Sequence, residues 1–185
     1  MLVVQKEKRR KVMKKITRIT AILSVLILGT YAYAAEALHE GSREFGVQGN
    51  VEFDSAVGTD VNVGLRAGKY VADGIQVGTF GSFADNDVDT RWGVGLYGEY
   101  NLVGAGPLVP FIGVSGAYNR SEPSGLSNSD AFVLGGEVGG KYFLARNTAL
   151  TLSYLFELAS EDIFADNSKL KDTNHNILLG LRFHF

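Results

Sequence analysis

The clearest indication of the fold is residues 174–185, Asn174-His-Asn-Ile-Leu-Leu-Gly-Leu-Arg-Phe-His-Phe185. From Ile177 onward every second residue is apolar, through Leu179, Leu181, Phe183 and Phe185. The positions between them are mostly small or polar. A period of two is the signature of a β-strand with one apolar face and one more polar face. The stretch therefore predicts a strand that separates an apolar from a polar environment.

The same alternation recurs along the chain. Seven further segments show it, at residues 43–54, 59–71, 75–84, 89–101, 109–119, 130–144 and 148–158. Most of them are longer than the five or six residues usual in a soluble sheet, and their length suits a tilted strand that crosses a membrane. An even number of strands lets a sheet close and remove its edges, as a bilayer requires. The sequence therefore predicts an all-β fold, an eight-stranded antiparallel up-and-down transmembrane barrel.

The connections between these segments differ in length. Those at residues 72–74, 102–107 and 145–147 are short, whereas 120–129 and 159–173 are long and polar. Small membrane barrels have short periplasmic turns and longer external loops. We therefore expect both ends of the barrel chain in the periplasm and the two longest loops outside.

The first 34 residues have the features of a secretory signal. Basic Lys14, Lys15 and Arg18 precede the apolar run Ile19–Leu28. A cleavage site of the A-x-A kind follows, at Ala32, Ala34 and Ala35. An uncleaved anchor is the alternative, but as a helix the run would rise only about 15 Å, half of a bilayer core. We expect residues 1–34 to be removed, 35–42 to form a short lead and 43–185 to form the barrel. Met13, which directly precedes Lys14 and Lys15, is a more usual first residue for such a signal than Met1.

Charge and cysteine content exclude some functions. The whole chain has 18 basic and 20 acidic residues. Residues 1–34 hold eight of the basic residues and one of the acidic residues, which leaves 10 basic and 19 acidic residues in the rest. Such an acidic chain is not expected to bind nucleic acid. The absence of cysteine excludes a disulfide framework and fits passage through an oxidising periplasm.

Aromatic residues supply a check on the predicted topology. Interfacial aromatic belts are typical of membrane barrels. With the predicted topology, one set of aromatic side chains falls near the periplasmic rim: Phe45, Tyr100, Phe111, Tyr142, Phe183 and Phe185. A second set falls near the outer rim: Phe53, Phe83, Trp92, Tyr118, Phe132 and Phe156.

The polar face of the predicted strands carries charges of both signs. Its acids are Glu44, Glu52, Glu99, Glu137 and Glu157, and its bases are Arg66, Arg91, Lys141 and Arg182. Side chains fill the interior of an eight-stranded barrel, and buried charges must be paired. We expect a plug of crossed ion pairs, in which Glu44 meets Arg182 where the barrel closes, and Arg66 or Lys141 meets Glu99 or Glu137. Re-pairing of these groups would give the alternative, a small gated pore for ions or small solutes. A soluble barrel that binds an apolar ligand is disfavoured, because this charged face would then line the ligand.

Four segments carry a family resemblance. Residues 68–78 (GKYVADGIQVG), 110–118 (PFIGVSGAY), 135–143 (GGEVGGKYF) and the last strand resemble the small outer-membrane β-barrels that include the OmpA transmembrane domain, OmpX and the Opa-like proteins. The resemblance implies a Gram-negative outer membrane, contact with lipid and lipopolysaccharide, and a monomeric barrel. It also implies that Gly180, Phe183 and Phe185 act as a signal to the barrel-assembly machinery. Leu178 departs from that signal, which usually has a polar residue there.

No motif in the chain indicates an enzyme, a metal site or a cofactor. Some small barrels modify lipid A acyl chains with serine and histidine. His39 precedes the barrel, His184 faces inward, and His175 lacks the His-x-Ser-Asn pattern of the lipid A deacylases. The acidic turn 85–89 lacks the glycine and glutamate of an EF-hand loop. A lipid A-modifying enzyme is therefore the third and least favoured hypothesis.

The two long loops, 120–129 and 159–173, are the predicted place for recognition, because loops on a rigid scaffold carry binding residues. The second loop holds Ile163 and Phe164 among acidic residues, an apolar pair that could contact lipid or a partner. We expect a role in envelope integrity or surface interaction, with an extracellular ligand at these loops.

Overall fold

The computed structural model describes residues 36–55, 58–85, 89–104, 106–123, 129–166 and 169–185. The predicted signal segment, including Ala32, Ala34 and Ala35, lies outside these ranges. The strands are β1 (Arg43–Ser55), β2 (Gly58–Ala72), β3 (Ile75–Asp85), β4 (Asp89–Asn101), β5 (Leu108–Pro123), β6 (Ser129–Ala145), β7 (Thr148–Ala159), β8 (Phe164–Asp166), β9 (Lys169–Lys171) and β10 (Thr173–His184). In these ranges no helix has the length and apolar character needed to cross a membrane.

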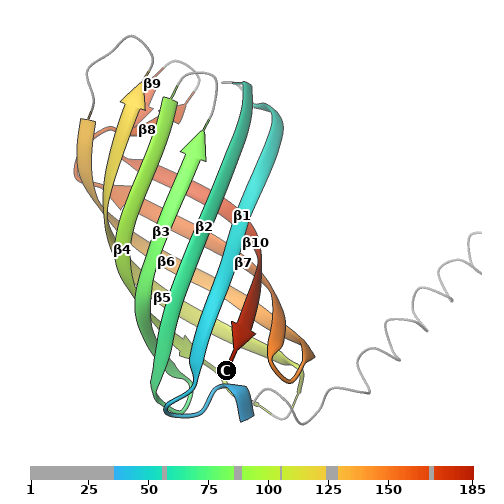
Figure 1. Ribbon diagram of the computed structural model, residues 1–185. Helices are drawn as coiled ribbons and strands as arrows, with labels where there is room; N and C mark the ends of the chain where they lie inside the picture. The colour runs from blue at the N-terminus through green and yellow to red at the C-terminus, as the bar shows by residue number, and fades with distance from the viewer. Residues whose placement is uncertain (1–35, 56–57, 86–88, 105, 124–128, 167–168) are drawn as a thin grey trace, which may run out of the picture.

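Eight of the described strands form one closed barrel, in the order β1-β10-β7-β6-β5-β4-β3-β2 (Figure 1). Successive strands around the barrel pair antiparallel, and β1 closes it by pairing with β10. The predicted fold class is confirmed. We call the end where β1 begins and β10 ends the terminal end, and the opposite end the loop end.

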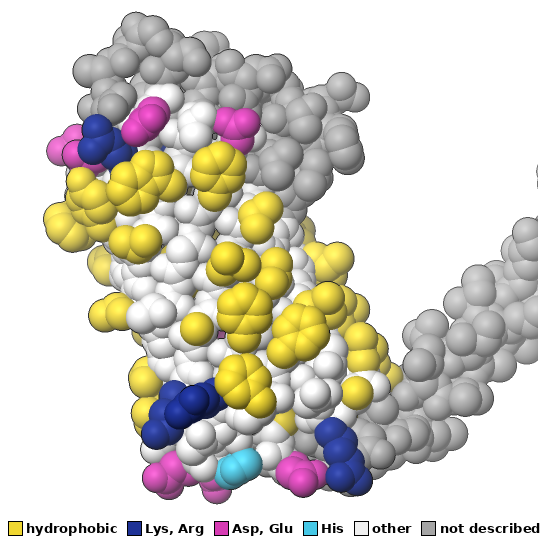
Figure 2. Space-filling model, in the orientation of Figure 1, with side chains coloured by type: hydrophobic (Ala, Val, Ile, Leu, Met, Phe, Trp, Pro, Cys, Tyr) yellow, Lys and Arg dark blue, Asp and Glu magenta, His cyan; other side chains and the backbone are white. Residues whose placement is uncertain are grey.

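The alternation seen in the sequence separates the two faces of the barrel wall. On β7, Leu150 and Leu152 are exposed, whereas Thr151 and Ser153, which alternate with them, are buried. The same division holds on β6, where Phe132 and Leu134 are exposed and Ala131 and Val133 are buried. On the face that Figure 2 shows, exposed apolar side chains cover the middle of the barrel, and charged side chains border them at both ends. An exposed apolar surface of this extent marks contact with a membrane or with another protein.

The strands at the loop end extend further than the sequence predicts. β5 continues to Pro123 and β6 begins at Ser129, so both ends of the predicted loop 120–129 belong to strands. The predicted loop 159–173 contains the β8–β9 hairpin, which pairs with itself rather than with the barrel wall. The two predictions were wrong for different reasons. The end of β5 is polar on both faces and so lacks the alternation that marks a strand, whereas β8 and β9 have only three residues each, too few to show a period.

Phe111 is a second correction. It was grouped with the aromatic side chains of the periplasmic rim, but its side chain is 1% exposed and lies inside the barrel, so it is not part of an outer aromatic belt. The neighbouring residue Ile112 is 55% exposed. Because successive side chains of a strand point to opposite faces, Phe111 must point inward when Ile112 points outward.

The closing seam between β1 and β10 differs from the other seams. Its ladder pairs Glu44–Gly49 with His184–Leu179 and then ends. Beyond it, residues 50–55 of β1 remain paired with β2, and residues 173–178 of β10 remain paired with β7. Among the described residues, the loop-end parts of β1 and β10 therefore have no ladder between them.

Candidate functional site

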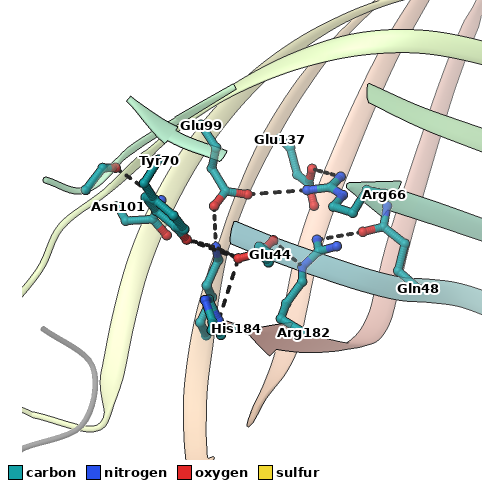
Figure 3. Close-up of polar contacts among 11 residues, drawn as sticks. Glu44, Gln48, Arg66, Tyr70, Glu99, Asn101, Glu137, Arg182 and His184 are labelled. Atoms are coloured by element: carbon teal, nitrogen blue, oxygen red, sulfur yellow. Dashed lines mark hydrogen bonds and ion pairs between the residues drawn. The ribbon is translucent and has the colours of Figure 1, made fainter. Parts of the chain in front are cut away.

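Six charged side chains from five strands meet inside the terminal half of the barrel. We call them the charged layer: Glu44 (β1), Arg66 (β2), Glu99 (β4), Glu137 and Lys141 (β6), and Arg182 (β10) (Figure 3). They point to one another because each occupies an inward position of its strand. Three acids face three bases, so the layer is electrically neutral as a set.

Glu44 lies at the centre of one half of the charged layer. Its Oε2 atom is 2.6 Å from Lys141 Nζ and accepts a hydrogen bond of 3.0 Å from the Tyr70 hydroxyl. Its Oε1 atom is 3.5 Å from Arg182 Nε. All these groups are buried. The structure thus brings Glu44 and Arg182 together across the seam where the barrel closes.

Arg66 lies at the centre of the other half. Its Nη2 atom donates to Glu137 Oε2 at 2.9 Å, and its Nη1 atom donates to Glu99 Oε2 at 3.3 Å. Glu99 Oε1 is also 2.5 Å from Lys141 Nζ, so Glu99 joins the two halves into one network. Each of the three bases contacts a carboxylate. Removal of any one partner would leave an unpaired charge in the buried interior, which is strongly unfavourable.

Aromatic rings support the bases of this layer. The Arg66 guanidinium lies 4.7 Å from the centre of the Tyr97 ring. Lys141 Nζ lies 5.6 Å from the ring centre of Phe111 and 5.8 Å from that of Tyr70. Such distances allow cation–π attraction, which adds to the ion pairs. The sequence prediction missed these rings, although the two-residue period marks Tyr70 and Tyr97 as inward residues.

The remaining predicted interior charges lie nearer the loop end. Glu157 accepts a hydrogen bond of 2.9 Å from Asn174 Nδ2 and is half-buried. The Arg91 guanidinium lies 5.6 Å from the centre of the Phe164 ring. Neither side chain is part of the charged layer. The side chain of Glu52 lies outside the described residues.

An apolar cap closes the terminal end of the barrel. Leu38 and Ala37, from the lead that precedes β1, pack with buried side chains of the barrel. The carbonyl of Leu38 accepts a hydrogen bond of 2.9 Å from the amide of Gly74, which belongs to the β2–β3 turn. This turn has a positive φ of 73° at Gly74, a conformation that glycine adopts without strain. The predicted lead is therefore part of the folded structure.

An apolar lid covers the loop end. Ile163 and Phe164 are 0% and 3% exposed and pack against Ala131 and Val133, on the inner face of β6, and Ala159. The hypothesis that Ile163 and Phe164 contact a partner at the surface is wrong, because they bury their own apolar area in the barrel mouth. Between this lid and the charged layer lies a cavity of about 80 Å³, which Phe164, Arg66 and Arg91 help to line.

The predicted aromatic residues lie at the two borders of the barrel wall. Phe45 opposes Phe183 on the neighbouring strand near the terminal end, where Tyr100, Tyr142 and Phe185 also lie. Near the loop end, Phe83 opposes Trp92, and Tyr118 packs edge-on against Phe132 with ring centres 5.7 Å apart. Phe156 lies 5.0 Å from His175 between ring centres. The side chain of Phe53 lies outside the described residues.

The histidines contact neither a serine–acid pair nor a metal-binding group in the described parts of the chain. His175 is exposed, and its Nδ1 atom lies 2.5 Å from the Tyr154 hydroxyl. His184 is buried, with Nε2 3.7 Å from Glu44 Oε2. His39 contacts Ser42 before β1 begins, with Nδ1 2.9 Å from the hydroxyl oxygen. No group of three potential metal ligands occurs among the described residues. Residues 86–88 of the acidic turn lie outside them.

No protein-family model matches the chain, and no curated protein matches it in sequence. Solved structures do match it in fold. Neisserial surface protein A is 17% identical, with a TM-score of 0.56, over 78% of this chain and 96% of that chain. The N-terminal barrel domain of Pseudomonas aeruginosa OprF is 15% identical, with a TM-score of 0.58, over 79% of this chain and 98% of that chain.

The chain has the fold of the small outer-membrane β-barrels. OprG, an outer-membrane protein of Pseudomonas aeruginosa, is similar as well, at 15% identity and a TM-score of 0.51, over 82% of this chain and 99% of that chain. At these identities the likeness concerns the backbone fold. The charged layer, the cap and the lid are therefore properties of this chain's own residues.

Proposed function

We propose that the chain is an integral outer-membrane barrel that acts without catalysis, in envelope integrity or in surface interaction. In this proposal it is exported through a cleaved signal and inserted as a monomer by the barrel-assembly machinery. The terminal end faces the periplasm and the loop end faces outward. The exposed apolar belt, with aromatic residues at both borders, supports contact with outer-membrane lipid and lipopolysaccharide.

The observation that carries the proposal is the buried, neutral charged layer. Glu44, Lys141 and Arg182 are each 0–1% exposed, and they are paired across the full width of the barrel. An open pore would leave such groups in contact with water. The apolar cap and lid add two further barriers at the ends. A sealed barrel is suited to anchor and display loops rather than to pass solutes.

Surface interaction would take place at the loop end. There β5 and β6 extend beyond the apolar belt and expose Arg120, Glu122 and Asp130. Arg120 Nε is 3.4 Å from Glu122 Oε1 and 3.9 Å from Asp130 Oδ1. An extracellular ligand of this protein would contact these charged strand ends.

A small gated pore is the second candidate, and one observation favours it. Arg66 is shared between Glu99 and Glu137, and Glu99 also contacts Lys141. Because the charged groups share partners, they can exchange partners without leaving any charge unpaired. A shift of Arg66 toward either carboxylate would change the width of the layer beside the cavity. At the charged layer the gated pore needs only a local rearrangement of the same residues, and the cap and the lid would have to open as well.

Single-channel conductance separates the two candidates. Residues 35–185 are refolded and inserted into a planar bilayer, and insertion is checked by heat-modifiable migration in a gel. We expect a silent barrel. Glu137→Ala, which removes the 2.9 Å partner of Arg66, is expected to produce brief openings, whereas the exposed control Glu122→Ala stays silent. Discrete and reproducible openings of the unaltered barrel would reject the sealed-barrel proposal in favour of the pore.

A further inference from the structure

Two basic side chains lie next to each other on the outer face of the barrel wall, at its terminal end. Arg43 of β1 and Lys69 of β2 are directly opposite each other in the ladder, and both are exposed. The alternation of the strands places them on the same face as Phe45 and Leu65, which belong to the exposed apolar belt. Figure 2 shows basic side chains where this belt ends.

Neither of these two bases has a partner within the protein. Like charges directly opposite each other on neighbouring strands are destabilising. Among the residues that the structure describes, the side chains of Arg43 and Lys69 form no ion pair and no hydrogen bond. The nearest acids do not neutralise them, because Glu44 is buried inside the barrel and Asp73 accepts a hydrogen bond from a backbone amide. The basic pair therefore favours an external anion that can lie between the two side chains.

An apolar groove lies on the same outer face, over β3, β4 and β5. It has a volume of about 430 Å³. Its outward side chains are those of Ile75, Val77, Tyr100, Ile112 and Val114. Gly98 forms its floor, because it is an outward position without a side chain between Val77 and Val114, its directly opposite neighbours on β3 and β5. The shape and the lining of the groove suit an acyl chain.

One row of the ladder joins the basic pair to the groove. Lys69 is directly opposite Val77, and Val77 is directly opposite Gly98. Neighbouring strands are about 4.8 Å apart, so Gly98 lies about 10 Å from Lys69 along the wall. The row begins at Arg43, the first residue of β1, and climbs around the barrel to His175 near the loop end of β10. Gly98 therefore lies deeper in the apolar belt than the two bases, as an acyl chain lies deeper than its head group.

We infer that this face of the barrel binds one molecule of an anionic phospholipid. The phosphate lies between Arg43 and Lys69 and accepts charge-assisted hydrogen bonds from both. One acyl chain passes over Val77 into the groove at Gly98. The inference deepens the proposed function and rests on it, because the terminal end is placed in the periplasmic leaflet, which is built of phospholipid. Phosphatidylglycerol is preferred to phosphatidylethanolamine, because the two bases repel the ammonium group of the latter.

Competition between these two lipids tests the head group. The purified protein is offered equal amounts of both, with identical acyl chains, and bound lipid is counted by native mass spectrometry. We expect the preference for phosphatidylglycerol to fall about fivefold in Arg43→Gln and in Lys69→Gln. The control Arg146→Gln removes an exposed base at the same end of the barrel and should change nothing. An equal loss in all three variants, or no preference in the unaltered protein, would overturn the inference.

A spin-labelled lipid tests the groove. One phosphatidylglycerol per barrel, with a nitroxide near the start of an acyl chain, is added to phosphatidylcholine nanodiscs, and paramagnetic broadening of amide signals is followed by NMR. We expect the strongest broadening at residues 75–77, 98–100 and 112–114. The same label on phosphatidylcholine should broaden signals evenly around the belt. Even broadening with both lipids would overturn the inference.

Two outward glycines supply a matched pair of variants. At Gly98 a Cβ atom would lie 4.0 Å from its nearest neighbour, and at Gly136 it would meet nothing within 4 Å, so both positions accept a side chain. A leucine at position 98 fills the groove, whereas one at position 136 lies outside its lining. Gly98→Leu should therefore remove the local broadening, and Gly136→Leu should keep it. The same broadening in both variants would show that the chain does not lie in the groove.

Failure of this inference can be told apart from failure of the proposed function. Insertion into vesicles is checked first, by heat-modifiable migration in a gel. A protein that inserts but shows no preference between the two lipids rejects the lipid site alone. A protein that does not insert rejects the membrane placement and the lipid site together.

Discussion

The two halves of the barrel interior are built differently. In the terminal half, the closing seam is laddered and the charged layer joins five strands through short ion pairs. In the loop half, the same seam is unladdered, a small cavity remains, and a hairpin paired only with itself supplies the lid. We infer that sealing and stability reside in the terminal half, and that the loop half can change its structure without unfolding the barrel. Substitutions that act on one half test this division.

Removal of Glu44 should have the largest effect. Glu44→Ala leaves Lys141 and Arg182 buried with one carboxylate fewer, and breaking a buried ion pair in this way costs about 3–5 kcal/mol. We expect a loss of that size in the free energy of unfolding, measured by urea denaturation in lipid vesicles. Glu44→Gln, which keeps the shape and one acceptor, should lose less. A change under about 1 kcal/mol in Glu44→Ala would mean that water already reaches the layer.

Two glycines on opposite faces of the barrel wall test how tightly the charged layer is packed. A Cβ atom at Gly46 would overlap the Arg182 guanidinium and lie 2.9 Å from Arg66 Cγ, in the middle of the charged layer. At Gly136 it would meet nothing within 4 Å. Overpacking costs about 1–3 kcal/mol, so Gly46→Ala should lower the free energy of unfolding by that amount and Gly136→Ala should not. Equal effects of the two substitutions, measured in the same urea titration, would show that the layer can make room.

The lid should respond locally. Phe164→Ala removes the largest side chain of the lid, but β8 and β9 pair only with each other, so the hairpin can open without unfolding the barrel. We expect amide exchange in residues 163–166 and 169–171 to rise about tenfold or more, and the midpoint of global unfolding to stay nearly constant. Phe132→Ala is the control at the same end, because Phe132 is 70% exposed and faces away from the lid. A large shift of the midpoint in Phe164→Ala would place stability in the loop half and contradict the comparison.

The sequence predicted the strands of the barrel wall, but it did not predict the cap and the lid that close the two ends. Alternation identified the strands, and the same parity put Glu44 and Arg182 on the inner face at positions where the first and last strands must meet. Leu38 and Phe164 carry no such signal, because they lie in segments without a period and are buried only through contacts made after the barrel has closed. Phe111 was grouped with the aromatic residues of the rim, although the parity of Ile112 places the Phe111 side chain inside the barrel. The unladdered part of the seam follows from strand register, which alternation does not determine, since every pairing with the same parity buries the same residues.

The smallest change in the free energy of unfolding is expected for the ion pairs at the surface of the loop end. Arg120 lies 3.4 Å from Glu122 and 3.9 Å from Asp130, and the three side chains are between 38% and 48% exposed. Exposed pairs contribute about 0.2–1 kcal/mol and are screened by salt, whereas buried pairs are screened much less. Arg120→Ala should therefore change the free energy of unfolding by less than about 1 kcal/mol, and the difference should vanish in 1 M salt. The loss in Glu44→Ala should persist at the same salt concentration, because ions do not reach Glu44, Lys141 and Arg182, whose side chains are fully buried. A salt-sensitive Glu44→Ala would show that solvent enters the terminal half, and the difference between the two halves would then lie in packing rather than in sealing.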